Sequence, residues 1–490
     1  MLRPALLTAL LLLPAADAQT GVSLADALTA AARQSPTVAL ADAQVVAERA
    51  GLQAAAAAFE PQLYGSVGGG QTETPLSSIQ QSAGLASSQG YQRYEVGVTR
   101  QFRSGLEVTP LVHMSRTALD GTSPLVETTA GLALAYPVLG GRDRNPALAA
   151  EEAAARRVEA AGADRTRATE QAAAEAAVAY WDYVGASRIR EALVVSEERA
   201  ARLLGETEAL VAADERPAAD LVPLRADLAR RRAARLAADQ AVYDARQWLG
   251  LAMGGTAEAA DALGPPTDPL PDVPQTVVVD ESALVALAIE ARADLAAADL
   301  RVDALDREAA AAVADLRPSV DVVVDASYSA LNEGAMGPQD LLPIGIGAER
   351  GGRVGVSLRV NRLGNGTTRA AAERRRAATT QARIARDDLA RRIRADLAGA
   401  IAGLRSGAAE VAQTREAVAL YEEAVVNERQ RLRLGMGTLF DVQIVEEHLA
   451  NARTAAVQAE VRYAQALVRL HAATGGLAAT SAPALASLPR

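Results

Sequence analysis

Two stretches of this sequence are too long and too free of helix breakers to fit inside an ordinary globular domain. Residues 147–213 and 367–434 contain no proline, and their glycines are isolated among Ala, Arg, Glu and Leu. Each stretch, at about 68 residues, would form a helix of roughly 100 Å at a rise of about 1.5 Å per residue. Further helical sequence follows each stretch, over about 217–249 and 438–473. The sequence therefore predicts two long helical hairpins.

The turn of the second hairpin is predicted within "RLRLGMGTLFDVQIVEE", residues 431–447. Gly435 can adopt the left-handed conformation that ends a helix, and Gly437 gives the chain the freedom to reverse. Thr438 is the predicted N-cap of the returning helix, and Asp441, three residues later, completes an approximate capping box.

The first hairpin is predicted to turn at "AADERPAAD", residues 212–220, a stretch that contains no glycine. Pro217 suits the first turn of the returning helix, because its missing N–H is one that the helix would not use there. Asp214 stands near the place that a glycine holds in the second turn.

Alternating apolar and polar residues before each long helical stretch predict β-strands. In the second half, Val320, Val322 and Val324 alternate with Asp321 and Asp325. Strands of about 9–10 residues with this alternation are typical of outer-membrane β-barrels. The alternation predicts two strands within 319–361 and four within 62–138, with a tight turn at 103–105.

A sheet of four or six strands cannot close into a barrel by itself. Open sheet edges in lipid leave backbone groups unsatisfied, so partner chains would have to close the sheet. Three copies would give about 12 strands, or about 18 if the additional first-half hairpin joins the sheet. A soluble β-sandwich is the alternative, but strands so few and so widely separated in sequence could not form two packed sheets.

The chain is predicted to consist of an export leader and two similar halves. Residues 1–18 combine Arg3, a short apolar core and an Ala-x-Ala cleavage pattern, which is typical of a signal peptide. Each half contains short helices, then strands, a glycine-containing corner and a long hairpin. The predicted segments are a first repeat at 19–262, a proline-rich linker at 263–280, a second repeat at 281–475 and a tail at 476–490.

Composition excludes several classes of protein. The absence of cysteine rules out disulfides and thiolate chemistry, and a net charge of −10 argues against nucleic acid as a partner. His113, His448 and His471 lie far apart without the spacing of metal ligands. No apolar run long enough for a membrane-spanning helix follows the leader. No catalytic residue, cofactor or metal is therefore predicted.

The order of these features resembles the TolC-like outer-membrane efflux protein family over nearly the whole mature chain. The most specific match is "LRLGMGTLFDV" (432–442), which looks like the family's tip motif, and "HLANARTAAVQAEVRYAQALVRLHAATG" (448–475) looks like its returning helix. The positions in register with the tip motif are Gly435, Thr438, Asp441 and Val442. Leu139, Gly140 and Gly141 match a strand-to-helix corner of the family, and Gly364 and Gly366 stand at the second corner.

The resemblance implies a mostly α-helical protein with a transmembrane β part. A homotrimer would form a β-barrel in the outer membrane and an α-helical tunnel through the periplasm. It would act as a passive conduit of a tripartite efflux or type I secretion system, with its tips against a periplasmic adaptor and an inner-membrane pump of RND, ABC or MFS type. The residues expected to contact the adaptor are Leu434, Gly435, Met436, Gly437, Thr438, Asp214 and Glu215.

The resemblance also places Asp441 at the tunnel constriction. Three copies of its carboxylate would crowd around the axis and attract cations. The alternative is that Asp441 only stabilises the N-terminus of its helix, and both roles can coexist. The chain departs from the family at two positions: Asp214 stands where the family has a glycine, and Gly437 stands where it has a basic residue.

Two other functions are open to the sequence. An enzyme is disfavoured, because no Ser/His/Asp set, metal cluster or phosphate loop is present. The corners "GGR" (140–142) and "GNG" (364–366) open helices and could hold anions, although a corner glycine pair is a weak signal. A soluble periplasmic coiled-coil protein, such as a pump adaptor, would need no alternating strands of bilayer length.

Overall fold

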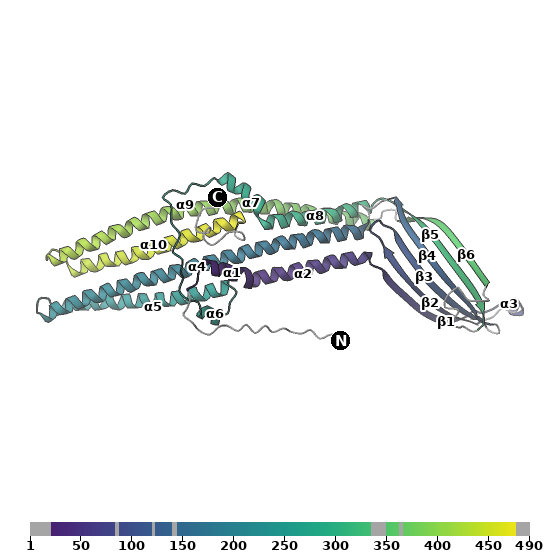
Figure 1. Cartoon of the computed structure of the whole chain (residues 1–490), viewed down its shortest axis with the longest axis horizontal. Helices are drawn as coiled ribbons and strands as arrows, with labels where there is room; N and C mark the ends of the chain where they lie inside the picture. The colour runs from purple at the N-terminus through teal and green to yellow at the C-terminus, as the bar shows by residue number, and fades with distance from the viewer. Residues whose placement is uncertain are drawn as a thin grey trace. The chain divides into compact units, whose positions relative to one another are not determined.

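The computed structural model describes residues 21–83, 88–119, 123–139, 145–334, 349–361 and 366–476, which form helices and a single sheet (Figure 1). The helices are α1 (Leu24–Gln34), α2 (Pro36–Ala56), α3 (Ser78–Ser82), α4 (Pro146–Ala212), α5 (Leu221–Ala252), α6 (Ala257–Asp261), α7 (Glu281–Ala291), α8 (Ala293–Ala314), α9 (Gly366–Arg433) and α10 (Leu439–Thr474), with 3₁₀ turns η1 (Ala57–Phe59) and η3 (Ala218–Asp220). The strands are β1 (Gln62–Glu73), β2 (Ser88–Gln101), β3 (Glu107–Leu119), β4 (Leu125–Leu139), β5 (Ser319–Glu333) and β6 (Glu349–Asn361).

The chain divides into two compact units, and each contains part of both long helices. Unit 1 comprises Met1–Gln44, Gly162–Ala296 and Asp387–Arg490, and unit 2 comprises Val45–Ala161 and Ala297–Arg386. Each unit therefore draws on both halves of the sequence. The hairpin turns belong to unit 1, and the sheet belongs to unit 2.

The long helices confirm the main expectation about the fold. Helix α4 has 67 residues and α9 has 68, and the returning helices α5 and α10 have 32 and 36. In unit 1, α9 buries a stripe of apolar side chains at helical spacing, which packs against Tyr463 and Leu467 of α10. The buried residues of this stripe are Ile393, Leu397, Ile401 and Leu404.

The start of the first returning helix differs from the prediction. Pro217 is not in the first turn of that helix, because its ψ of 140° is extended. It precedes η3, in which the amide of Asp220 donates to the carbonyl of Pro217 at 3.1 Å. Helix α5 then begins at Leu221. The tight 3₁₀ turn accommodates the reversal before regular helix geometry is reached.

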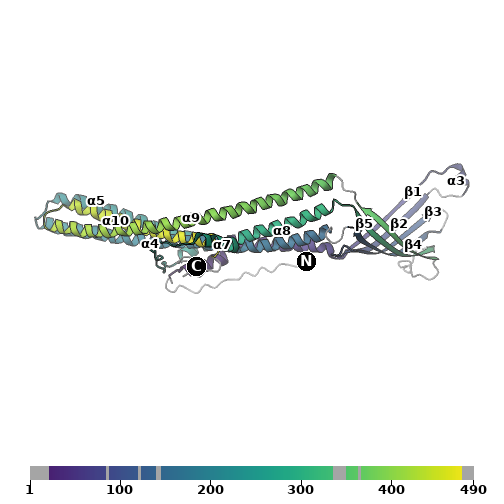
Figure 2. The same cartoon turned by 90° about the horizontal axis from the view of Figure 1, so that it is seen from above.

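All six described strands form one antiparallel sheet in unit 2, in the order β1-β2-β3-β4-β5-β6 (Figure 1 and Figure 2). Four strands come from the first half and two from the second, as predicted. Strands β4 and β5 join the halves, with Leu125 opposite Glu333 and Leu139 opposite Val320. The β-sandwich alternative is wrong, because it requires two packed sheets.

The two faces of the sheet differ in polarity. On β5, Val320 and Val324 lie on one face and Asp321 lies on the other, because successive strand residues alternate. The polar face carries cross-strand contacts, such as that between Thr129 Oγ1 and Ser329 Oγ at 2.9 Å. No helix among the described residues is both long and apolar enough to cross a bilayer.

The proline-rich segment that follows α6 is fastened to α4 by tyrosine hydroxyls within unit 1. Tyr180 donates to Asp268 Oδ2 at 2.6 Å, and Tyr183 donates to the carbonyl of Gly264 at 3.1 Å. Burial and the Asp268 carboxylate raise the pKa of Tyr180, so this hydroxyl stays protonated as a donor. Trp181 is buried beside these residues, with its ring edge-on to that of Tyr180.

Candidate functional site

The turn between α9 and α10, here called the second tip, is closed by a left-handed glycine as predicted. Gly435 has φ +75°, and its amide donates to the carbonyl of Leu432 at 3.1 Å. The amide of Met436 reaches back to the carbonyl of Arg431 at 2.9 Å. These two bonds form a Schellman-type C-cap, which satisfies carbonyls that the end of α9 leaves free.

The turn between α4 and α5, the first tip, has the same backbone geometry without a glycine. Asp214 has φ +58° and is the one non-glycine residue with positive φ in the described chain. Its amide donates to Val211 at 3.1 Å, and the amide of Glu215 donates to Leu210 at 2.9 Å. Asp214 is therefore the structural counterpart of Gly435, since a short polar side chain tolerates this conformation better than most.

The two returning helices start differently. At the second tip, Thr438 and Asp441 form a full capping box. The backbone N–H and Oγ1 of Thr438 donate to Asp441 Oδ2 at 2.9 and 2.7 Å, and the Asp441 amide donates to Thr438 Oγ1 at 3.2 Å. At the first tip, Pro217 occupies the corresponding position and makes no side-chain cap. The second tip is thus capped on both of its helices.

Gly437 is needed because there is little room for a side chain, and not because its backbone angles are unusual. A Cβ added there would lie 2.8 Å from Glu428 Oε1 and 3.4 Å from Arg431 Cβ. No positive φ occurs at this residue. The second glycine of the tip lets the backbone pass close to the end of α9, and the expectation that it supplies rotational freedom is wrong.

The hydrogen bonds of Asp441 show its local role directly. The Thr438 hydroxyl, then the Thr438 amide and the charge of Arg431, hold the pKa of the Asp441 carboxyl below its usual value. Asp441 is therefore ionised and capping at neutral pH. Its predicted position at a constriction depends on further chains and stays a prediction.

Sequence reasoning missed Asp220, the counterpart of Asp441 in the first tip. Asp220 follows Asp214 by six residues, and Asp441 follows Gly435 by six. Arg216 lies where the second tip has Gly437, and its Nη1 is 3.4 Å from Asp220 Oδ2. Aligning the two tips on their left-handed residues would have revealed both positions. A basic tip residue is therefore present, in the first tip.

The second tip exposes large apolar side chains. Leu434, Met436 and Phe440 are 63%, 62% and 65% exposed, and Val222 of the first tip is 68% exposed. Exposed apolar residues grouped at one place on a surface are typical of interaction sites.

Polar contacts join the two hairpins behind the tips. Arg230 of α5 donates through both terminal nitrogens to Glu447 of α10, at 2.6 and 2.8 Å. Nearer the turn, Gln443 Nε2 donates to the carbonyl of Pro223 at 3.4 Å. These contacts are exposed, so they hold the hairpins less firmly than an apolar core would.

The predicted strand-to-helix corners lie largely outside the described residues. This applies to Gly140, Gly141 and Gly364. Gly366 is described as the first residue of α9, and a Cβ added there would meet open space.

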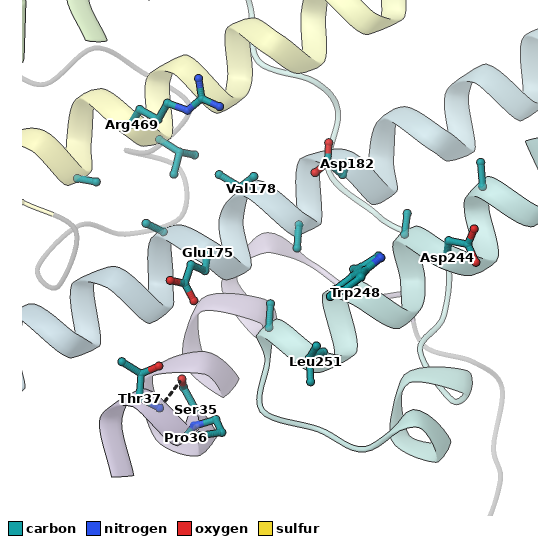
Figure 3. Close-up of a pocket in the computed structure, with 17 residues that line it drawn as sticks. Ser35, Pro36, Thr37, Glu175, Val178, Asp182, Asp244, Trp248, Leu251 and Arg469 are labelled. Atoms are coloured by element: carbon teal, nitrogen blue, oxygen red, sulfur yellow. Dashed lines mark hydrogen bonds between the residues drawn. The ribbon is translucent and has the colours of Figure 1, made fainter. Parts of the chain in front are cut away.

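A groove lies in unit 1, where the start of α2 lies beside the end of α5 (Figure 3). It has a volume of about 900 Å³, and alanines, Val178, Trp248 and Leu251 form most of its wall. Asp182 and Asp244 bind the amides of Gln465 and Gln240 at 2.7 and 2.8 Å. The lining contains no histidine, so it offers no side chain of ordinary pKa near neutrality to serve as a general base. No group of three potential metal ligands occurs among the described residues.

The family model described as "Outer membrane efflux protein" matches residues 284–476. The outer-membrane channel OprN has a similar fold, with a TM-score of 0.69, 18% identity, and 92% of this chain and 90% of OprN covered. VceC from Vibrio cholerae has a TM-score of 0.67 and 19% identity, with 92% of this chain and 96% of VceC covered. The open state of the MtrE channel from Neisseria gonorrhoeae has a TM-score of 0.61 and 18% identity, with 93% of this chain and 89% of MtrE covered. No curated protein matches the chain by sequence.

Proposed function

We propose that this chain, whose residues 284–476 match the family model described as "Outer membrane efflux protein", forms the outer-membrane channel of a tripartite efflux system. The observation that carries the proposal is the combination of two long hairpins with one amphipathic antiparallel sheet. Solved outer-membrane channels share this fold over 92% of the chain. A periplasmic adaptor, the alternative function, would leave the sheet without a role.

The channel is a homotrimer in this proposal. The sheet has two unpaired edges among the described strands, β1 and β6, and backbone groups without partners cost several kcal/mol each in lipid. Closure by further copies satisfies them. The helical hairpins extend the conduit into the periplasm, and transport through it is passive, with energy supplied by a partner pump.

The hairpin tips dock onto a periplasmic adaptor that connects the channel to an inner-membrane pump. The exposed Leu434, Met436 and Phe440 support this assignment, because such a group of apolar side chains gains free energy when a partner covers it. Asp214 and Glu215 contribute the corresponding surface of the first tip.

Localisation and assembly test the proposal. The full chain, expressed in a Gram-negative host, should fractionate with the outer membrane and migrate as a trimer that dissociates on heating. Together with its cognate adaptor and pump it should restore export to a strain that lacks its own channel. Recovery as a soluble periplasmic monomer would refute the proposal.

Asp441 lies at the narrowest part of the conduit in this proposal. Replacing Asp441 with Asn should change the conductance and the cation block of reconstituted trimers, because three charges leave a narrow aqueous pore. Asp220→Asn tests whether its first-tip counterpart shares the constriction. Glu206→Gln, at an exposed position of α4, is the control. Unchanged conductance and cation block in Asp441→Asn would remove the constriction assignment.

A further inference from the structure

The β1–β2 hairpin is paired with the rest of the sheet. Strand β2 pairs with β3 from Gln89 opposite Leu119 to Gly97 opposite Leu111, and again from Arg100 opposite Val108 to Gln101 opposite Glu107. Strand β1 pairs with β2 along its whole length of 12 residues. The hairpin therefore lies in the same sheet as β3–β6 and makes its contacts through ladder hydrogen bonds.

The apolar face of the sheet continues across this hairpin in register. Leu63 is opposite Val98, and Val67 is opposite Tyr94, which is in turn opposite Met114 of β3. On β5 the apolar face runs from Val320 to Ala330, ten residues along the strand. At about 3.3 Å per residue and a tilt of about 40°, this gives a band about 25 Å tall, the height expected for a lipid-facing band.

Two tyrosines fix the register of β1 and β2 on the opposite face. A Cβ added at Gly97 would lie 2.5 Å from the ring of Tyr64, and one added at Gly70 would lie 2.8 Å from the Tyr91 hydroxyl. Each ring thus lies against the glycine opposite it on the neighbouring strand. Aromatic rings over cross-strand glycines restore packing that glycine by itself cannot supply.

The two edges of the sheet are complementary. Strands β1 and β6 run in opposite directions, because they are the first and last of six strands that alternate in direction. Both edges expose large apolar side chains on the same face: Leu63 and Val67 are 75% and 78% exposed, and Val354 and Val356 are 78% and 71% exposed. A long apolar edge of this kind needs a β-strand as its partner. A second copy of the chain offers the opposite edge with a matching face.

We propose that β6 of each copy pairs with β1 of the next, so that three copies close an 18-stranded wall. This inference rests on the proposed function and adds that the first-half hairpin belongs to the wall. If the hairpin were outside the wall, β3 would form the edge and three copies would give 12 strands. Because barrel diameter grows about linearly with strand number, the 18-stranded barrel is about 1.5 times as wide.

Disulfide trapping distinguishes these arrangements, and the chain contains no cysteine that would interfere. One cysteine replaces Val354, Val356 or Leu358 of β6. A second replaces Leu63, Gly65 or Val67 of β1, or instead Val108, Val112 or Met114 of β3. All these positions lie on the apolar face. After oxidation of outer membranes, covalent species are separated under non-reducing conditions. The pair Val324→Cys with Val356→Cys, directly opposite on β5 and β6, is the intrachain control for strand pairing and oxidation.

The proposal predicts covalently linked trimers from at least one β6–β1 combination and none from the β6–β3 combinations. Links between β6 and β3 would overturn the 18-stranded wall and leave the proposed channel function intact. A functioning intrachain control with no link between copies from either set would instead contradict closure by copies of this chain, and with it the proposed trimer.

Discussion

The first and second tips have the same backbone path but different side chains. Each ends its long helix with a left-handed residue and the same pair of hydrogen bonds, and each places an aspartate six residues later. The second tip uses Gly435 and a capping box, whereas the first tip uses Asp214 and Pro217. The reversal of the chain therefore requires a left-handed residue at each tip. Gly435 and Asp214 differ in how much free energy this conformation costs.

The largest effect is expected for Gly435→Val. No atom lies within 4 Å of the Cβ position, so the cost comes from the backbone alone, about 1–2 kcal/mol for a left-handed residue. Hydrogen–deuterium exchange at the amide of Met436 should accelerate, and export that depends on tip docking should fall, while the trimer still forms. Gly435→Asp, which copies the first tip, is the matched control and should lose less amide protection and less export than Gly435→Val. Equal protection in Gly435→Val and the unmodified protein would contradict this account.

The next effect is expected at the capping box. Thr438→Ala removes a side-chain cap worth about 1 kcal/mol, and the first turn of α10 should exchange faster, whereas Thr438→Ser should retain protection. Conversely, Pro217→Thr should give the first tip a hydroxyl three residues before Asp220 and slow exchange at the Asp220 amide. If the amides in the first turn of α10 exchange at the same rate in Thr438→Ala and Thr438→Ser, the hydroxyl has no capping role.

A smaller gain is expected for Asp214→Gly. Glycine relieves the left-handed strain but adds entropy to the unfolded tip, so the net stabilisation should be below about 1 kcal/mol. Exchange at the amide of Glu215 should slow slightly. Asp214→Ala should accelerate that exchange, because alanine has the strain without the local hydrogen bonding of aspartate. Faster exchange in the glycine variant would show that the aspartate side chain stabilises the turn.

The smallest effect is expected for the pair that links the hairpins. Arg230→Gln removes the ion pairs of this exposed arginine with Glu447 and with Asp227, each worth about 0.2–1 kcal/mol and weakened by salt. The rate of amide hydrogen–deuterium exchange near residues 443–447 should be higher than in the unmodified protein at low ionic strength. At high ionic strength the two rates should become equal. An increase that is independent of salt would indicate lost packing of the arginine stem instead of lost charge.

Much of the second tip was predictable because its signals are local. A left-handed glycine and a Thr–Asp capping box involve neighbours within five residues, and the sequence shows both. The first tip was harder to predict, since its left-handed residue is an aspartate and its helix starts through a 3₁₀ turn after Pro217. The space requirement of Gly437 depends on Glu428, nine residues earlier on α9, and could not be read from the glycine itself.

The sequence by itself determined the helical hairpins, the alternating strands and the positions of the turns, because helix and strand periodicity and caps are short-range properties. The tertiary structure decided that all six described strands share one sheet, that β4 meets β5 across the two halves, and that Asp220 is the counterpart of Asp441. These relations join residues hundreds of positions apart or depend on backbone angles. They follow from strand pairing and chain reversal, which no local pattern encodes.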